Sequence, residues 1–556
     1  MFKKMTYKKT TALALLGALS LWLVLHLPGV FYGTEDTPLH ESYMTADEQS
    51  PINGALHILK DRSVLGLKNQ NTLYYGPVLA MLALPAVAVD YSLNLLKGTV
   101  AGAESYKDFI VWDWGGILEW ARVIAVCAGF LGILAVYLIF STATVNRSKN
   151  QLMPFIASFL LAGNYLYFEY TNFFRHWIFI VVIILWQIYF GIKIFESKEK
   201  RLLFWSAQTV LTIFVFGISY SGVLFLVFWV PFLFLWFKEK QWKLLKEFPI
   251  HTLIVLLGCA VMVWWHPYAF FRILGLVGTD VVSPLGTVSP VLNIESDLNP
   301  FLSLIFYTKV LFVNNFFLIL GGFILLTVHF REMIYKSILP WAFLAPAVLN
   351  YVIFSSLEHH ETRYIFPVSV LLTLFVYALF FEAYQVLGWK DKIVRLVVFL
   401  IGLSFIINCL QIVLWQRMIL TGPPERRETI SQIHEWQEED QGTKTLVVKN
   451  WPLGYVHTHN AYEDYITRYN KKGYDLWQYV LTLNPPEGIE PLNVYYIHTD
   501  EELTSELLEE YDHVVKHAGA SVGNDIANES PNDEFDIRPW HLLHFKKYQE
   551  TFSIIK

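Results

Sequence analysis

The 556-residue chain is 54% hydrophobic and 16% aromatic, and only 16% of its residues are charged. Soluble domains average about 45–50% apolar and about 25% charged residues. Apolar stretches of about twenty residues recur through the first three quarters of the chain, as in proteins with several transmembrane helices. This pattern excludes a soluble enzyme, a disordered tail, a coiled coil and a porin-type barrel. The three cysteines are too few and too scattered for a disulfide framework or a zinc cage.

The apolar stretches predict an α-helical polytopic membrane protein with about eleven transmembrane helices. They lie at residues 10–32, 116–142, 151–168, 177–195, 202–218, 222–237, 248–266, 310–328, 338–357, 364–384 and 393–416. The first stretch follows four lysines and lacks a small-residue cleavage pattern, which favours an uncleaved helix. Nineteen Lys and Arg residues lie in the N-terminal tail and in alternate connections, against nine on the opposite side. Because basic residues favour the cytoplasm, the N-terminus is expected inside and the C-terminal part outside.

One further apolar segment, at residues 75–96, is long enough to be a twelfth span. Counting it would invert every later connection and place four basic clusters outside. Pro77, Pro85 and Asp90 also suit a helix in the interface better than one that crosses the apolar core. The segment is therefore predicted to be interfacial.

The charge changes sign near residue 416. Residues 1–416 carry a net charge of +5, whereas residues 417–556 carry −11. The last part mixes strand-like runs such as TLVVKN and NVYYIH with an amphipathic helix predicted around residues 500–517. We expect an extracytoplasmic soluble domain of α/β or α+β type over residues 417–556, without recognisable chemistry of its own. Nucleic acid is excluded as a partner, because no basic segment there is interleaved with aromatic residues.

A long connection at residues 33–115 on the predicted outer side contains the first candidate for chemistry. Asp47 and Glu48 open an amphipathic stretch within it. Adjacent carboxylates just above a membrane can act as a general base or bind a cation. They can equally complement the dipole of a helix N-terminus, and the residues alone leave both interpretations open.

The second candidate is the connection after residue 357, where Glu358, His359, His360, Glu361 and Arg363 crowd between two spans. Ionisable residues at the membrane face are costly and are functional candidates by default. A guanidinium beside imidazoles suits a phosphate or pyrophosphate. Zinc ligation by the histidines and glutamates, or snorkelling of interfacial charge, are the alternatives.

Four polar residues, Glu169, Asn172, Arg175 and His176, lie among aromatic residues in another outer connection. This combination suits a sugar or a lipid head group, and an aromatic belt at the interface is the alternative. Arg122 and Lys309 lie near the outer ends of spans, where each either binds phosphate or snorkels.

Together these motifs resemble the GT-C superfamily of membrane glycosyltransferases, which includes protein mannosyltransferases, aminoarabinose transferases and Rgt-type enzymes. Asp47-Glu48 is similar to the acidic pair of that family, and the Tyr-Tyr-Gly-Pro run at 74–77 to its Tyr-x-x-Pro element. Arg122 matches an arginine near the start of the second span. HHETRYIFP at 359–367 is similar to the His-x-Glu-x-Arg loop of dolichol-phosphate-mannose-dependent transferases. The resemblance covers residues 10 to about 416.

The resemblance implies an inverting transferase in the plasma or inner membrane that builds cell-envelope glycans. It implies a polyprenyl-phosphate-linked sugar donor, a glycan, lipid or protein acceptor, contact with membrane lipids, and an extracytoplasmic active site. Asp47 is then the base, and Glu48 supports it. The candidate substrate-binding and donor-binding residues are Tyr75, Arg122, Glu169, Arg175, His176, Lys309, His359, His360, Glu361 and Arg363.

Two features depart from the family pattern. Many members carry an acid in the second outer connection, where this chain has Arg175-His176 and only Glu169 nearby. Tyr75-Gly76 also replaces the acid of the Tyr-Glu-Lys-Pro variant, so no metal ligand is assigned and a divalent metal is left open. A transporter or flippase of lipid-linked sugars and a non-catalytic assembly protein are the alternatives. A transporter should carry charges deep in its spans and inverted repeats.

Overall fold

The computed structural model describes most of the helical part of the chain and short pieces of its C-terminal part. The described residues are 17, 20–31, 46–69, 75–112, 115–145, 153–197, 199–267, 300–334, 338–355, 362–421, 435–436, 439–440, 442–448, 494–497, 509–519 and 550–554.

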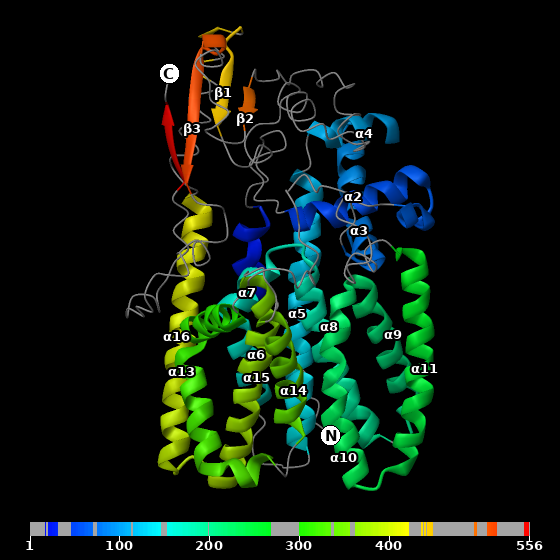
Figure 1. The fold of residues 1–556 in the computed structure, drawn as a ribbon, viewed down its shortest axis with the longest axis vertical. Coiled ribbons are helices and arrows are strands. Elements are labelled where there is room, and N and C mark those ends of the chain that lie inside the picture. Colours follow the sequence, from blue (N-terminus) through cyan, green and yellow to red (C-terminus); the bar gives the residue numbers. More distant parts are fainter. Residues whose placement is uncertain are drawn as a thin grey trace.

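Most of the helices run side by side in one elongated bundle (Figure 1). In chain order they are Ser20–Val30, α2 (Ala46–Asp61), α3 (Pro77–Lys97), α4 (Ala103–Trp112), α5 (Gly115–Val145), α6 (Met153–Ala162), α7 (Tyr165–Thr171), α8 (His176–Glu196), α9 (Arg201–Ile218), α10 (Trp229–Lys238), α11 (Trp242–Trp265), α13 (Pro300–Ile334), α14 (Leu339–Ser355), α15 (Thr362–Leu387) and α16 (Lys392–Thr421). Two 3-10 helices, η1 (Val64–Asn69) and η2 (Tyr220–Phe228), interrupt this order. The end of the bundle that carries α2 and α4 in Figure 1 is called the upper end below.

Within the described residues, seven helices are long and apolar enough to cross a membrane, as in an integral membrane protein. They are Pro77–Lys97, Gly115–Thr142, His176–Glu196, Arg201–Ile218, Trp242–Trp265, Tyr364–Leu387 and Lys392–Arg417. A bent pair within α13, Leu304–Phe312 and Asn314–Thr327, adds an eighth if it is counted as one span.

The predicted number of eleven spans is not confirmed. Six predicted spans coincide with long helices, and the one predicted at 310–328 coincides with the bent pair in α13. Those predicted at 151–168, 222–237 and 338–357 correspond to shorter apolar helices. Of the span predicted at 10–32, the structure describes residues 17 and 20–31 alone, and Ser20–Val30 is helical. Local turns explain part of the difference. The apolar run at 151–168 is divided into α6 and α7, because the side chain of Asn164 caps α7 by accepting a hydrogen bond from the backbone of Tyr167 at 3.0 Å.

The segment predicted to be interfacial forms α3, with Pro77 at its first position and Gly98 ending it in the left-handed conformation at φ 75°. Its length and composition also suit a span. In the structure it lies at the upper end of the bundle (Figure 1). It contacts the first turn of α5, where a Cβ added to Gly116 would meet the carboxylate of Asp90 at 2.0 Å.

The bundle packs around α15, the most enclosed of the candidate spans, because 89% of its apolar 18-residue stretch is buried inside the protein. It contacts α13, α14, α8, α6 and α7. By contrast, only 11% of the corresponding apolar stretch of α11 is buried. This helix lies at the side of the bundle (Figure 1), and its exposed apolar surface suits contact with lipid.

Two glycines allow α7 to approach α5 closely. A Cβ added to Gly132 would lie 2.2 Å from the hydroxyl of Tyr167, and that hydroxyl donates a hydrogen bond to the backbone oxygen of Gly129 at 2.6 Å. This close approach fixes the position of α7 and of the connection that follows it to α8.

The described part of the C-terminal region is a four-stranded mixed sheet in the order β2-β1-β3-β4. Its strands are β1 (Thr445–Val448), β2 (Val494–Ile497), β3 (His513–Gly519) and β4 (Glu550–Ile554). Two strands form within the predicted strand-like runs. The helix expected around 500–517 is wrong for its last part, where β-branched Val514 and Val515 pair with β1 and Val515 also pairs with β4.

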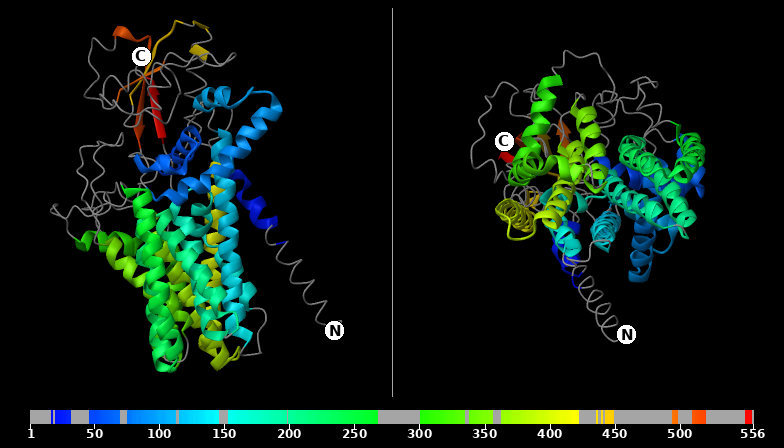
Figure 2. Two further views of the ribbon diagram at one scale, coloured as in Figure 1. Left: turned by 90° about the vertical axis from the view of Figure 1, so that its right-hand side faces the viewer. Right: turned by 90° about the horizontal axis from the view of Figure 1, so that it is seen from below.

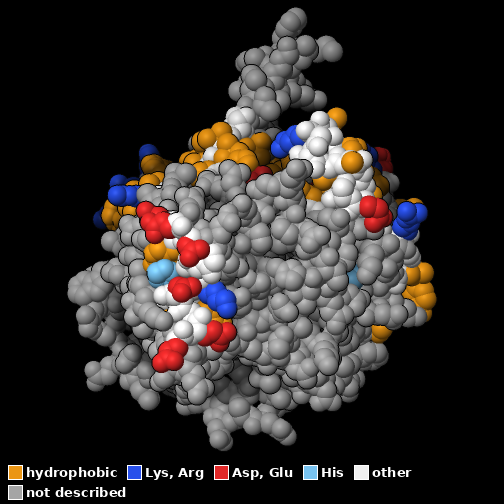
Figure 3. All heavy atoms as spheres, turned by 90° about the horizontal axis from the view of Figure 1, so that it is seen from above, with side chains coloured by type: hydrophobic (Ala, Val, Ile, Leu, Met, Phe, Trp, Pro, Cys, Tyr) orange, Lys and Arg blue, Asp and Glu red, His pale blue; other side chains and the backbone are white. Residues whose placement is uncertain are grey.

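The strands lie beyond the upper end of the bundle (Figures 1 and 2). Seen from above, carboxylates gather on one side of this face (Figure 3). The exposed acidic residues of the described C-terminal pieces are Glu435, Glu439, Asp440, Glu509, Glu510 and Asp512. This agrees with the acidic charge of residues 417–556.

Candidate active site

Segments that are distant in the sequence meet at the N-terminus of α8. The ring of Tyr75, just before α3, lies against His176, with centroids 4.2 Å apart. The next residue of α8, Trp177, contacts Tyr364 at the start of α15 edge-on, with centroids 5.7 Å apart. Tyr170 on α7 stacks on Phe366 of α15 at 4.5 Å. The structure therefore brings together residues in or beside the three connections that the sequence predicted to carry the site.

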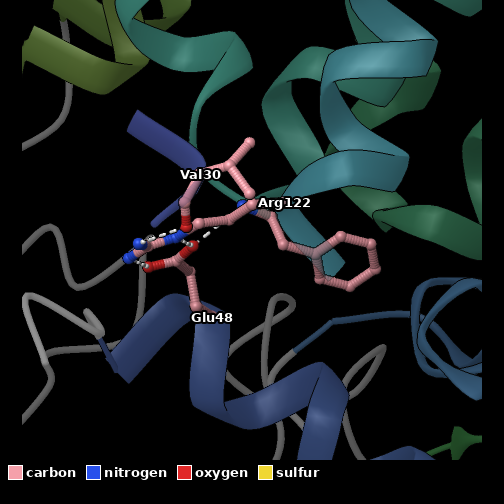
Figure 4. A network of polar contacts seen from close by, with 4 residues as sticks. Val30, Glu48 and Arg122 are labelled. Carbon is pink, nitrogen blue, oxygen red and sulfur yellow. Dashed lines mark hydrogen bonds and ion pairs between the residues drawn. The ribbon is translucent and has the colours of Figure 1, made fainter. Parts of the chain in front are cut away.

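A buried ion pair joins Glu48 and Arg122 beside these segments (Figure 4). The guanidinium donates from Nε to Oε1 at 3.2 Å and from Nη2 to Oε2 at 3.3 Å. Glu48 also accepts a hydrogen bond from the backbone N–H of Phe174 at 2.9 Å, and Arg122 donates to the backbone oxygen of Val30 at 3.5 Å. Both charged residues are 0% exposed, so the pair is fully removed from water.

This network connects four elements. Val30 ends the helix Ser20–Val30, Glu48 lies in the first turn of α2, Arg122 lies near the start of α5, and Phe174 precedes α8. A buried carboxylate is stable only when its charge is paired and hydrogen-bonded, and here both conditions are met. The pair therefore fixes the first turn of α2, which contains Asp47, against the start of α5 and the α7–α8 connection.

The ring of Phe173 lies near two cations. The guanidinium carbon of Arg122 is 5.8 Å from its centroid and that of Arg175 is 5.1 Å away. Cations within about 6 Å of an aromatic face are attracted to it. The charge of Arg122 is balanced by Glu48, and Arg175 occupies the N-cap position of α8.

The other candidate residues are placed to different extents. Glu169 is buried in α7, and Lys309 is half-buried in α13. Asp47 lies in α2 and Arg363 in α15, but their side chains are not among those that the structure describes, and His359, His360 and Glu361 lie outside the described residues. Their roles stay predictions. The structure gives Arg122 a partner inside the protein, and its proposed contact with a donor likewise stays a prediction.

One polar contact near the candidate site involves His26, which the motifs did not include. The Nδ1 of His26 lies 2.8 Å from the amide oxygen of Asn172, and both side chains are buried. The His26 ring stacks on Phe168 at 4.1 Å. A lone histidine in the apolar run LWLVLHLPG was the available signal, but its partner lies 146 positions away.

Within the described residues, no group of three or more His, Cys, Asp or Glu side chains is arranged to hold a metal ion. The candidate histidines at 359 and 360 are outside this set. The described contacts of Glu48 are those of a carboxylate neutralised by a guanidinium.

No family model matches the chain, and neither does any curated protein. Two solved structures of ArnT from Cupriavidus metallidurans, a GT-C aminoarabinose transferase, are similar to it. The apo structure has 12% sequence identity and a TM-score of 0.43, covering 80% of this chain and 85% of that chain. The structure bound to undecaprenyl phosphate has 11% identity and a TM-score of 0.46, covering 90% and 93%.

Proposed function

We propose that the chain is a GT-C-type membrane glycosyltransferase that moves a sugar from a polyprenyl-phosphate-linked donor to a glycan, lipid or protein acceptor. The observation that carries the proposal is the convergence at the N-terminus of α8. The first turn of α2, the start of α3, the α7–α8 connection and the start of α15 meet there, and each contains a residue of the predicted site. Ionisable side chains gathered at one end of a helix bundle suit a reaction at the membrane surface.

The proposed displacement at the anomeric carbon requires a base beside the attacking hydroxyl and a cation beside the leaving phosphate. Asp47 takes the proton of the acceptor hydroxyl, whose oxygen bonds to the anomeric carbon with inversion. The bond between that carbon and the phosphate oxygen breaks, and the polyprenyl phosphate leaves with the electron pair. Arg363 and His360, which lie in the same connection, are proposed to stabilise the negative charge on this leaving group.

Glu48 is proposed as a positioning residue rather than a second base. Its carboxylate is occupied by Arg122 and by the backbone of Phe174, and it is 0% exposed. A carboxylate that is enclosed in this way is not exposed to an acceptor hydroxyl, but it holds the first turn of α2 in place. Asp47, its neighbour in that turn, then has a fixed backbone from which to act.

The upper end of the bundle is proposed to face the extracytoplasmic side, with the N-terminus in the cytoplasm. The basic connections of the sequence support this orientation. Glycosylatable tags inserted after residue 420 should be modified, whereas tags within 238–247 should not. Modification at both positions, or at neither, would reject this orientation.

The function is tested with membranes that contain the protein and a panel of radiolabelled polyprenyl-phosphate sugars. Transfer of label from one donor to an acceptor is expected for the native chain. Asp47→Asn should lower turnover by roughly a hundredfold or more while donor binding stays nearly intact. Glu104→Gln is the matched control, since Glu104 is an exposed carboxylate in the first turn of α4 at the same end.

The same experiment separates the alternatives. A transporter or flippase of lipid-linked sugars, or a non-catalytic assembly protein, should tolerate Asp47→Asn as well as Glu104→Gln. Near-normal turnover of Asp47→Asn, together with loss in variants of Glu35, Asp36 or Glu41, would place the base earlier in the same loop.

A further inference from the structure

The N-terminus of α8 has no side-chain cap. Its N-cap residue, Arg175, is extended at φ −120° and ψ 152° and makes no capping hydrogen bond. The first N–H groups of any α-helix lack partners within the helix, and the helix dipole adds partial positive charge at this end. An anion is the natural partner of such an end, but the feature alone does not identify a site.

A second observation points to a ligand at the same place. Nδ1 of His176 and Nε1 of Trp177 are buried and have no hydrogen-bond partner within the part of the chain that the structure describes. The two residues are 5% and 2% exposed. Buried polar atoms are almost always hydrogen-bonded in folded proteins, and the indole N–H can only donate. Trp177 therefore needs an acceptor, and the imidazole nitrogen can serve as a second donor.

The two rings that carry these nitrogens lie side by side at the helix end. The rings of His176 and Trp177 have centroids 4.3 Å apart. Side chains of a helix lean toward its N-terminus, so those of the first two residues lie over the uncapped turn. Tyr75 packs against His176, while Phe354 and Tyr364 pack against Trp177 at 5.8 and 5.7 Å, so aromatic rings shield this end from water.

The charges around the helix end also favour an anion. Arg175 brings a guanidinium to the N-cap, held over the ring of Phe173. The carboxylate of Glu48, bonded to the same connection, is neutralised by Arg122. Glu169, the other carboxylate of this region, is buried in α7 with contacts of its own.

We propose that the first turn of α8 is an oxyanion-binding subsite, in which the helix N–H groups, Arg175, His176 and Trp177 hold a phosphate or carboxylate group of a substrate. The choice of substrate rests on the proposed function. The oxyanion belongs either to the phosphate of the polyprenyl lipid or to an acidic group on the acceptor. Many GT-C transferases carry an acid in the second outer connection. In this chain Arg175 and His176 occupy that place, and we assign them to a cationic subsite.

The subsite is tested by binding to the purified full-length chain in lipid nanodiscs. The probes are a polyprenyl monophosphate, the uncharged polyprenol of the same length, and inorganic phosphate. Trp177→Phe keeps a ring but removes the N–H donor, and Arg175→Gln removes the charge. Trp186→Phe is the matched control, because Trp186 lies in the middle of α8 against Tyr189.

If the lipid supplies the oxyanion, both variants should raise the Kd for polyprenyl monophosphate by roughly tenfold or more, as for a lost hydrogen bond to a charged group. The Kd for polyprenol and the behaviour of Trp186→Phe should stay unchanged. If the acceptor supplies it, lipid affinity is retained. Inorganic phosphate then binds the lipid-saturated native protein, and both variants lose this binding.

The subsite would be overturned if both variants bound every probe with native affinity. It would also be overturned if the variants lost as much affinity for polyprenol as for polyprenyl monophosphate. The proposed function fails by a different result, namely no preference of the native chain for polyprenyl monophosphate over polyprenol and no labelled transfer. Loss of inorganic phosphate binding in both variants would support the subsite even then.

Discussion

Removing Arg122 should destabilise the fold strongly, because it leaves a buried carboxylate without its counter-charge. Within the described residues, Glu48 has two hydrogen bonds from Arg122 and one from the backbone of Phe174. Arg122→Met keeps most of the side-chain volume but leaves only the Phe174 N–H for a carboxylate that is 0% exposed. Removing one partner of a buried ion pair costs roughly 3–5 kcal/mol, and we expect a loss of this size in the free energy of unfolding.

A double-mutant cycle can show whether Glu48 and Arg122 stabilise the fold as a pair or independently of each other. Replacing Glu48 with Met as well removes the stranded charge, so the double variant should regain most of the stability lost in Arg122→Met. Unfolding is followed by equilibrium titration of the purified protein with SDS in mixed micelles, using tryptophan fluorescence. Arg395→Met, at an exposed position on α16, is the control and should change the free energy by less than about 0.5 kcal/mol.

Two results would refute this reasoning. One is an Arg122→Met variant within about 1 kcal/mol of the native chain, which would mean that the carboxylate of Glu48 is not stranded when its partner is lost. The other is a double variant whose loss equals the sum of the single losses. In either case the pair could not be what holds the first turn of α2 against α5.

Two further predictions concern binding and packing. Arg363→Ala should weaken binding of a polyprenyl-phosphate donor, but not of the acceptor, by roughly 1.5–3 kcal/mol. Arg363→Lys should restore only part of the donor affinity, since Lys lacks the guanidinium fork. Unchanged donor affinity of Arg363→Ala in a direct binding assay would rule out this role. Gly76→Val should lower the melting temperature, since even a Cβ at Gly76 would lie 2.1 Å from the backbone oxygen of Gly217 and overpacking costs roughly 1–3 kcal/mol. Gly102→Ala, with nothing within 4 Å of its added Cβ, is the control and should melt like the native chain, and equal melting of both variants would contradict the close approach.

The membrane helices were largely predictable, because their signal is local. A long apolar run such as 364–384 reports burial or lipid contact regardless of its neighbours, and the structure has α15 there. The interruptions were harder. Asn164 ends one helix and caps the next within an apolar run, and one polar residue in such a run carries too little signal to divide it. The 3-10 segment η2 within the run at 222–237 has no signal in composition either.

For the candidate site, the sequence predicted which segments lie near one another, but not their contacts. The motifs indicated that the connections around Glu48, His176 and Arg363 lie at one end of the molecule, and the structure brings their neighbours together. The motifs treated Glu48 and Arg122 as separate contributors to catalysis and donor binding. Their pairing spans 74 positions and depends on how α2 packs against α5, which no local pattern encodes.

The buried ion pair also sets an order for the biogenesis of this protein. Glu48 enters the membrane environment early, but its counter-charge follows 74 residues later, and the backbone N–H that completes its coordination 126 residues later. A ribosome adds residues in sequence at about 5–20 per second, so the carboxylate waits for several seconds without its final partners. During that interval the first turn of α2 has to stay at the aqueous surface of the membrane. The network of Glu48 and Arg122 at the upper end of the bundle is thus assembled only after α5 and the α7–α8 connection have emerged, although Glu48 is among the earliest residues made.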